Sequence, residues 1–204
     1  MTSISKNMFI NAVFLGIFTI AGTAIVAFTY DKTQQRIADN KRDYTLRKLH
    51  ELISPTMHDN DLNTDVIKVK DPLLARDAEM TVYRARKNNQ PVAAIIECIA
   101  PDGYSGNIRL LVAINYNGKL AGVRVTEHLE TPGLGDAIEA NKSDWIYIFK
   151  DKSLEQPTSE HWRVRRDGGE FDQITSATIT SRAIVKVTHN VLKYFKENRE
   201  NLFN

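Results

Sequence analysis

The sequence predicts an α+β fold, in which an antiparallel sheet packs with helices and follows a single transmembrane helix. Three observations predict this class: an uncharged run near the N-terminus, a series of short strand-like runs separated by turn residues, and a final segment with helical periodicity. The chain has 204 residues with six prolines and ten glycines, which suits one globular domain of ordinary size with an appendage.

The first element is the uncharged run. Residues 8–30 (MFINAVFLGIFTIAGTAIVAFTY) carry no charge and are long enough to cross the hydrocarbon core of a membrane as a helix. A cleaved signal peptide is the alternative, but the run is long for the apolar region of a signal peptide and has only a weak small-residue site at 22–24. We therefore expect a cytoplasmic N-terminus at 1–7 and an uncleaved transmembrane helix at 8–30.

Two further features of this run concern its surroundings. Small side chains recur at spacings of three and four residues, a weak signal that a second membrane helix approaches here: Ala12, Gly16, Thr19, Thr23 and Ala27. Basic residues lie mostly after the run, since Lys6 precedes it and Lys32, Arg36, Lys41 and Arg42 follow. This local count favours a cytoplasmic C-terminal part, although long domains are translocated largely regardless of flanking charge.

Helix formers dominate the next segment. Residues 31–56 are expected to form a helical stalk that Pro55 ends. Strand-like runs then alternate with turn residues at 65–70, 80–85, 91–99, 107–115 and 120–127. Short turns such as Asn117-Gly118 join consecutive runs, which predicts antiparallel order within a domain at 57–204.

A proline and two glycines interrupt the strand pattern at 127–136. One interpretation is a turn into a short helix around 136–140. The other is a backbone that approaches a flat ligand closely, because Gly133 and Gly135 carry no side chain.

The last element is an amphipathic helix with hydroxyls crowded at its start. From residue 183 onward apolar residues recur at helical spacing, and upstream of them lie Thr175, Ser176, Thr178, Thr180 and Ser181. Such hydroxyls are typical N-caps, which need no further role. They would equally suit a phosphate group, because unpaired N–H groups and the positive end of the helix dipole gather at a helix start. Spacing by itself favours capping.

Composition excludes several classes of function. The net charge is +2, from 27 basic and 25 acidic residues, and no basic run is interleaved with aromatic residues, so a nucleic-acid partner is not expected. The single cysteine, Cys98, excludes an internal disulfide and lies in an apolar run. The five histidines form no pair at metal-ligand spacing, so no metal is predicted.

A resemblance sharpens the interpretation of the hydroxyl-rich segment. Residues 172–178 (DQITSAT) resemble the D-x-x-[S/T]-G-A-T motif of the FMN-binding domain family, in which the last threonine carries FMN through a phosphoester. The matching residue here is Thr178. The sequence departs from the motif at Ser176, where the family has glycine. If that position requires a positive φ or close approach by a modifying enzyme, attachment would be less efficient here.

Further motifs resemble the G-subunit family of the bacterial Rnf (Rsx) electron-transport complex. They lie at 126–136 (TEHLETPGLGD), 100–106 (APDGYSG), 143–145 (SDW) and 167–172 (DGGEFD), and the likeness covers the apolar helix and nearly all of the domain. The resemblance implies a covalently bound FMN, attached by an ApbE-type flavin transferase, in a domain on the periplasmic side of a single-pass inner-membrane protein.

By this resemblance the chain is an electron-transport flavoprotein and phosphoprotein, and it acts as an enzyme only as one subunit of an ion-translocating oxidoreductase, a translocase. Its expected partners are the other membrane, iron–sulfur and flavin subunits. No catalytic residue is expected. The residues expected to bind FMN are Thr175, Ser176, Ala177 and Thr178 at the phosphate and His128, Glu130, Thr131, Pro132, Gly133, Leu134 and Gly135 at the ring, with Tyr104 and Trp145 as stacking candidates.

Three alternatives differ from this interpretation. The C subunit of the sodium-pumping NADH:quinone oxidoreductase shares the covalent-FMN domain, but the runs at 100–106 and 171–173 favour the Rnf subunit. A cofactor-free membrane assembly anchor would use Thr178 only as a cap. A hydrolase would use Ser or Thr near His189, yet the sequence has no G-x-S-x-G elbow.

Overall fold

The computed structural model describes residues 3–204 and divides into two units, one that ends at Tyr44 and one that runs Thr45–Asn204. The first unit consists of most of helix α1, Ser3–Leu52. From Met8 to Tyr30 its large apolar side chains are exposed. A helix of this length and apolarity can cross a membrane, where lipid would cover those side chains.

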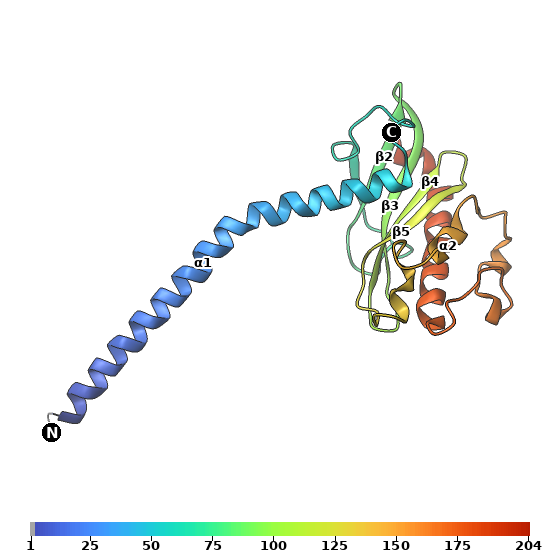
Figure 1. Cartoon of the computed structure of the whole chain (residues 1–204). Coiled ribbons are helices and arrows are strands. Elements are labelled where there is room, and N and C mark those ends of the chain that lie inside the picture. The colour runs from blue at the N-terminus through green and yellow to red at the C-terminus, as the bar shows by residue number, and fades with distance from the viewer. Residues whose placement is uncertain (1–2) are drawn as a thin grey trace. The chain divides into compact units, whose positions relative to one another are not determined.

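The last turns of α1 belong to the second unit. Leu49, Leu52 and Ile53 are buried against the sheet. Along the chain the helix is followed by the strands and then by a final helix (Figure 1). The helix ends at Leu52, three residues before Pro55, and the N–H of Ile53 still bonds the carbonyl of Leu49 (2.9 Å). The C-terminal end of the predicted stalk at 31–56 is therefore part of the globular unit.

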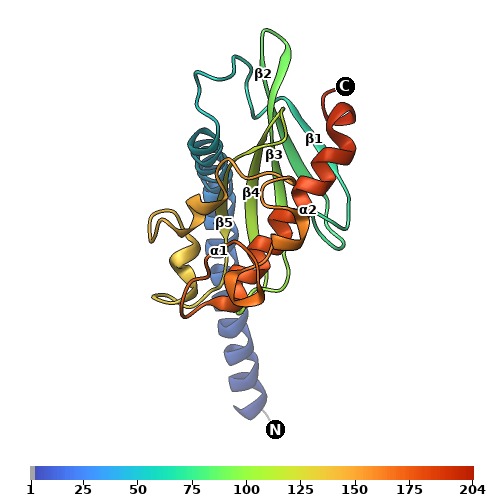
Figure 2. The same cartoon turned by 90° about the vertical axis from the view of Figure 1, so that its right-hand side faces the viewer.

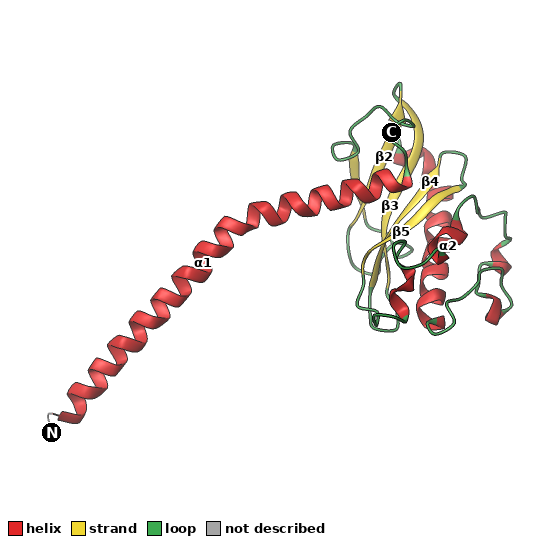
Figure 3. Cartoon of the chain, in the orientation of Figure 1, coloured by secondary structure: helices red, strands yellow, loops and turns green. Residues whose placement is uncertain are grey.

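The sheet is a five-stranded antiparallel meander in the order β1-β2-β3-β4-β5 (Figure 3). Its strands are β1 Val66–Val69, β2 Met80–Lys87, β3 Gln90–Ala100, β4 Ile108–Asn115 and β5 Leu120–Glu127. The predicted strands and their antiparallel order are confirmed. Alternation in β3 sends Ile96 and Cys98 to one face and Ile95 to the other, so both faces are covered.

Helix α2, Thr178–Leu202, lies across one face of the sheet (Figure 2). Its apolar stripe, which includes Ile184, Val191 and Phe195, is buried, as the helical periodicity predicted. The opposite face packs against the end of α1. The domain is thus an α+β sandwich of helix, sheet and helix.

Between β5 and α2 the chain forms a long connection with four short 3₁₀ helices: η1 Gly135–Ile138, η2 Trp145–Phe149, η3 Ser159–His161 and η4 Arg165–Asp167. The short helix expected around 136–140 is the single turn η1. Aromatic contacts hold the connection on the core, with Phe171 stacked near Phe149 and Trp162 at ring distances of 5.3 and 4.6 Å. Its ends, near Glu130 and Ala177, meet at the start of α2.

Candidate functional site

A cavity of about 450 Å³ lies at the start of α2. The loop after β5 contributes Glu130, Thr131, Leu134 and Gly135, and the chain entering α2 contributes the whole range 175–180. Tyr104 and Arg166 line it from two other segments. The fold therefore brings together the two stretches that the sequence indicated as opposite ends of one ligand site.

The start of α2 is not capped by a hydroxyl. Its N-cap is Ala177, and no side chain makes a capping hydrogen bond, so the N-capping interpretation is wrong. The first bond into the helix runs from the N–H of Ser181 to the carbonyl of Ala177 (3.0 Å). The N–H groups of Thr178, Ile179 and Thr180 consequently have no acceptor within the helix, at the end where its dipole is positive.

The hydroxyls of this segment divide into two groups. Thr180 and Ser181 are fully buried, and Ser181 Oγ accepts from the N–H of Ile174 (3.1 Å) while it donates to the carbonyl of Ala177 (3.0 Å). Thr175 and Ser176 form the exposed tip of a turn that the N–H of Ala177 closes onto the carbonyl of Ile174 (3.0 Å). Thr178 is half-buried and lines the cavity.

Ser176 does not require the conformational freedom of glycine. Among the described residues, the non-glycine residues with positive φ are Asn88, Asn89 and Asp151, so Ser176 lies outside the left-handed region. Replacement of the motif glycine by serine therefore introduces no backbone strain here.

Glu130 lines the cavity and joins three segments of the chain. Only 5% of this residue is exposed, and its carboxylate accepts from Thr180 Oγ1 (2.7 Å) and from the N–H of Ser105 (3.1 Å). A buried carboxylate is tolerated when such donors satisfy it. The two bonds connect the loop after β5 to α2 and to the turn before β4.

Two glycines make room for the Glu130 side chain. A Cβ at Gly135 would lie 2.6 Å from Glu130 Oε2, and a Cβ at Gly103 would lie 2.9 Å from Glu130 Oε1. Gly135 thus serves close packing against Glu130. Gly133 has φ +78°, in the left-handed region that favours glycine, and it turns the loop.

Three predicted ring-contact residues do not line the cavity: Pro132, Gly133 and His128. Pro132 and Gly133 are exposed in the turn of the loop. His128 Nδ1 accepts from the N–H of Glu130 (3.0 Å), which leaves Nε2 as the protonated nitrogen that donates to Glu139 (3.1 Å). His128 therefore stabilises the loop through these two hydrogen bonds and is not part of the cavity lining.

The two aromatic candidates have different roles. Tyr104 lines the cavity and is 70% exposed, so its ring is available to a ligand. Trp145 packs edge-on against Phe149, and its Nε1 donates to the carbonyl of Asp172 (2.6 Å). Trp145 is a structural residue of the connection.

A nearby ion pair holds the base of the loop. Lys142 Nζ contacts Asp136 Oδ2 at 3.0 Å, and this ammonium holds the pKa of the Asp136 carboxyl below its usual value. The N–H of Gly133 bonds the same carboxylate and acts in the same direction. The carboxylate thus joins the turn of the loop to the chain after η1.

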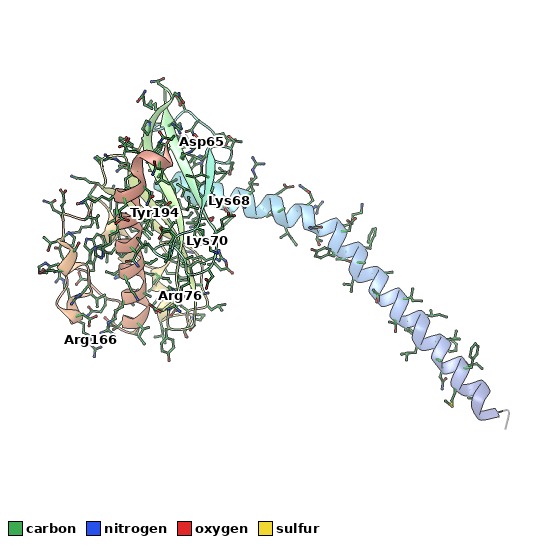
Figure 4. The ribbon with its side chains drawn as sticks, turned by 180° about the vertical axis from the view of Figure 1, so that it is seen from behind. Asp65, Lys68, Lys70, Arg76, Arg166 and Tyr194 are labelled. Atoms are coloured by element: carbon green, nitrogen blue, oxygen red, sulfur yellow. The ribbon has the colours of Figure 1, made fainter. Side chains whose placement is uncertain are left out.

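Arg166 is one of two lining residues, with Ile179, that the sequence analysis did not name. It lies in η4, in the connection beside α2, and Figure 4 places it level with the end where α2 begins. The only available signal was the basic run at 163–166, which by itself is typical of a solvated surface.

The described residues offer little to a metal or a hydrolase. Within that part of the chain no group of three His, Cys, Asp or Glu side chains converges as a metal site. His189 stacks on Trp162 at 5.2 Å with its Nε2 3.3 Å from Ser159 Oγ, and burial lowers its pKa to about 4. This histidine is a packed core residue and does not line the cavity.

Comparison with known proteins defines the class. The FMN-binding domain family matches residues 103–193, a range that contains every residue lining the cavity, and the RnfG N-terminal region matches residues 1–52. The solved structure of Shewanella oneidensis NqrC has the same fold, with a TM-score of 0.50 at 20% identity over 74% of this chain and 70% of NqrC. The chain is thus an FMN-binding α+β domain with an N-terminal apolar helix.

Curated relatives define the family within that class. A Pseudomonas aeruginosa protein is 46% identical over 198 residues, covering 97% of this chain and 92% of the relative. A Vibrio parahaemolyticus protein is 41% identical over 202 residues, covering 99% and 94%. Both are named as the G subunit of an ion-translocating oxidoreductase complex. This chain belongs to the same family.

Proposed function

We propose that this chain is a membrane-anchored electron carrier of an Rnf-type ion-translocating oxidoreductase, and that it holds FMN in the cavity through a phosphoester at Thr178. One observation carries the proposal. The threonine that the motif marks for attachment lines the same cavity as the loop 130–135, although about 45 residues of chain separate the two. The chain would catalyse a reaction only as part of the complex.

The cavity suits the two ends of FMN. Its volume lies within the range of cofactor sites. Hydroxyls and unpaired N–H groups at the start of α2 suit an anionic phosphate. Leu134 and Tyr104, from two other segments, are exposed apolar surfaces of the cavity that suit a flat aromatic ring, and Ile179, next to Thr178 in α2, adds a third.

The residues have separate roles in this proposal. Thr178 Oγ1 bonds the phosphorus of a flavin dinucleotide held by a flavin transferase, the pyrophosphate bond breaks, and a nucleoside monophosphate and the hydroxyl proton are released. Leu134 and Tyr104 bind the ring and exclude water from one side. Glu130 keeps the loop, α2 and the turn before β4 together. When bound, FMN supplies one-electron transfer, and the ester prevents its loss by dilution.

The proposed localisation is supported by α1 and by the family. We place residues 8–30 in the inner membrane, residues 1–7 in the cytoplasm, the stalk at 31–56 and the FMN-binding domain at 57–204 in the periplasm. The apolar run and the external flavin site of the family support this, while the basic residues after the run oppose it. A periplasm-specific reporter fused to Asn204 tests it, and reporter activity restricted to the cytoplasm would reverse the topology.

The partners are the other subunits of the complex and an ApbE-type transferase. The alternative assignment, a C subunit of the sodium-pumping NADH:quinone oxidoreductase, shares the fold with NqrC, but 20% identity contrasts with 46% to a relative from the Rnf-type family. A cofactor-free anchor would leave the cavity without a ligand. The small residues of α1, among them Gly16 with open space around it, would admit a neighbouring membrane helix.

The experiment is co-expression with a flavin transferase, followed by a denaturing gel viewed under ultraviolet light and mass spectrometry. Wild-type protein should give a fluorescent band with one FMN on Thr178. Thr178→Val keeps the β-branched shape and should lose the label while the domain stays folded. Thr175→Val is the matched control at the turn. It keeps the acceptor hydroxyl of Thr178 and should still carry label, in a reduced amount. Label retained in Thr178→Val, or mapped to another hydroxyl, would show that the site is placed wrongly.

A further inference from the structure

We propose that Arg166 is the phosphate-binding residue of the cavity, and that its guanidinium makes the site select a phosphorylated flavin over riboflavin. This inference deepens the proposed function and rests on it. It assigns a role to a residue outside both sequence motifs, which lines the same cavity as Thr178 in the folded domain.

The turn that carries Arg166 is held in place from two sides. Val164 forms a bridge with Phe171, and a Cβ at Gly169 would lie 1.9 Å from the carbonyl oxygen of Arg163, so the segment closes tightly on itself. Asp167 pairs with Arg182 in the second turn of α2, with both carboxylate oxygens contacted, at 2.5 and 2.6 Å. This ion pair ties η4 to the helix whose N-terminus borders the cavity.

Two neighbouring arginines of this region are already paired. Arg165 Nε contacts Asp172 at 3.0 Å, and Arg182 contacts Asp167. For Arg166, no carboxylate of the described residues lies within ion-pair distance, while its backbone N–H donates to Gln173 Oε1 (3.3 Å). Its guanidinium is therefore available to an anion in the cavity that it lines.

Two charged groups line the cavity, and one of them attracts an anion. The charged residues that line it are Glu130 and Arg166. The Glu130 carboxylate accepts hydrogen bonds from Thr180 and Ser105 and would repel a second anion. Arg166 and the free N–H groups of α2 both attract one, and a guanidinium matches two phosphate oxygens at once. In this proposal the flavin phosphate lies beside Arg166 and Thr178, which leaves the apolar surface of Leu134 to the ring.

The test compares two ligands that differ only in the phosphate. Thr178→Val protein, which cannot be labelled covalently, is titrated with FMN and with riboflavin while flavin fluorescence is followed. Arg166→Ala in that background should weaken FMN binding about tenfold, the order of a charge-assisted bond, and leave riboflavin binding unchanged. Arg165→Ala is the matched control and should change neither. Equal losses for both flavins, or no loss for FMN, would overturn the proposal.

A second measurement decides the matter if free flavins bind too weakly to titrate. The initial rate of covalent labelling by the transferase should fall in Arg166→Ala and recover in Arg166→Lys, which restores the charge, while Arg165→Ala labels like wild type. Labelling of Arg166→Ala at the wild-type rate would overturn the inference. Absence of any FMN on wild-type Thr178 would instead overturn the proposed function, so the two failures are distinguishable.

Discussion

Thr180→Val tests whether the Glu130 carboxylate assembles the cavity. Thr180 is fully buried, and its hydroxyl donates to Glu130 Oε2 over 2.7 Å. Valine keeps the shape and removes the donor, so the buried carboxylate keeps only the N–H of Ser105. A hydrogen bond to a charged group contributes about 1.5–3 kcal/mol, and we expect the free energy of unfolding to fall by that amount. For a chain of this size the midpoint should drop by about 3–12 °C.

The assay is tryptophan fluorescence during heating or urea unfolding of the full-length chain in detergent. The two tryptophans of the sequence, Trp145 and Trp162, both pack in the domain, so the signal reports on that domain. Thr175→Val, at the exposed turn, is the control and should stay within about 0.5 kcal/mol of wild type. The reasoning would be refuted if Thr180→Val lost no more unfolding free energy than the control. It would also be refuted if the losses of Thr180→Val and Glu130→Gln were fully additive in the double variant.

Three further predictions concern other buried groups. Burial lowers the pKa of His189 to about 4, against about 6.5 in the unfolded chain. Because the unfolded chain binds more protons between these two values, stability should fall as the pH drops from 6.5 to 4. In His189→Gln the urea midpoint should depend less steeply on pH over this range. Gly135→Ala places a Cβ 2.6 Å from Glu130 Oε2 and should cost about 1–3 kcal/mol in urea unfolding; wild-type stability would rule out the packed loop. Cys98 is buried in β3 and burial raises the pKa of its thiol, so a thiol reagent should label it only in urea; rapid labelling of native protein would contradict its position.

The elements of this protein are encoded locally, which is why the sequence alone determined them. An uncharged run long enough for a membrane, alternating apolar residues between turns, and a three-and-four repeat after residue 183 each reflect the period of a single element. The α+β class, the antiparallel order and the helix α2 followed from these patterns. Two motifs also marked Thr178 and the loop 130–135, which line one cavity in the folded domain.

Tertiary structure decided which of the marked residues share a cavity. The connection between β5 and α2 has no periodicity, so its path depends on contacts such as the ring contact of Phe171 with Trp162, and not on local propensity. That path buries Glu130 against Thr180 and directs His128 to Glu139. It also brings Arg166 to the start of α2, where Ala177 stands in place of the expected hydroxyl cap. These contacts join residues far apart in the chain, and only the packed core sets their distances.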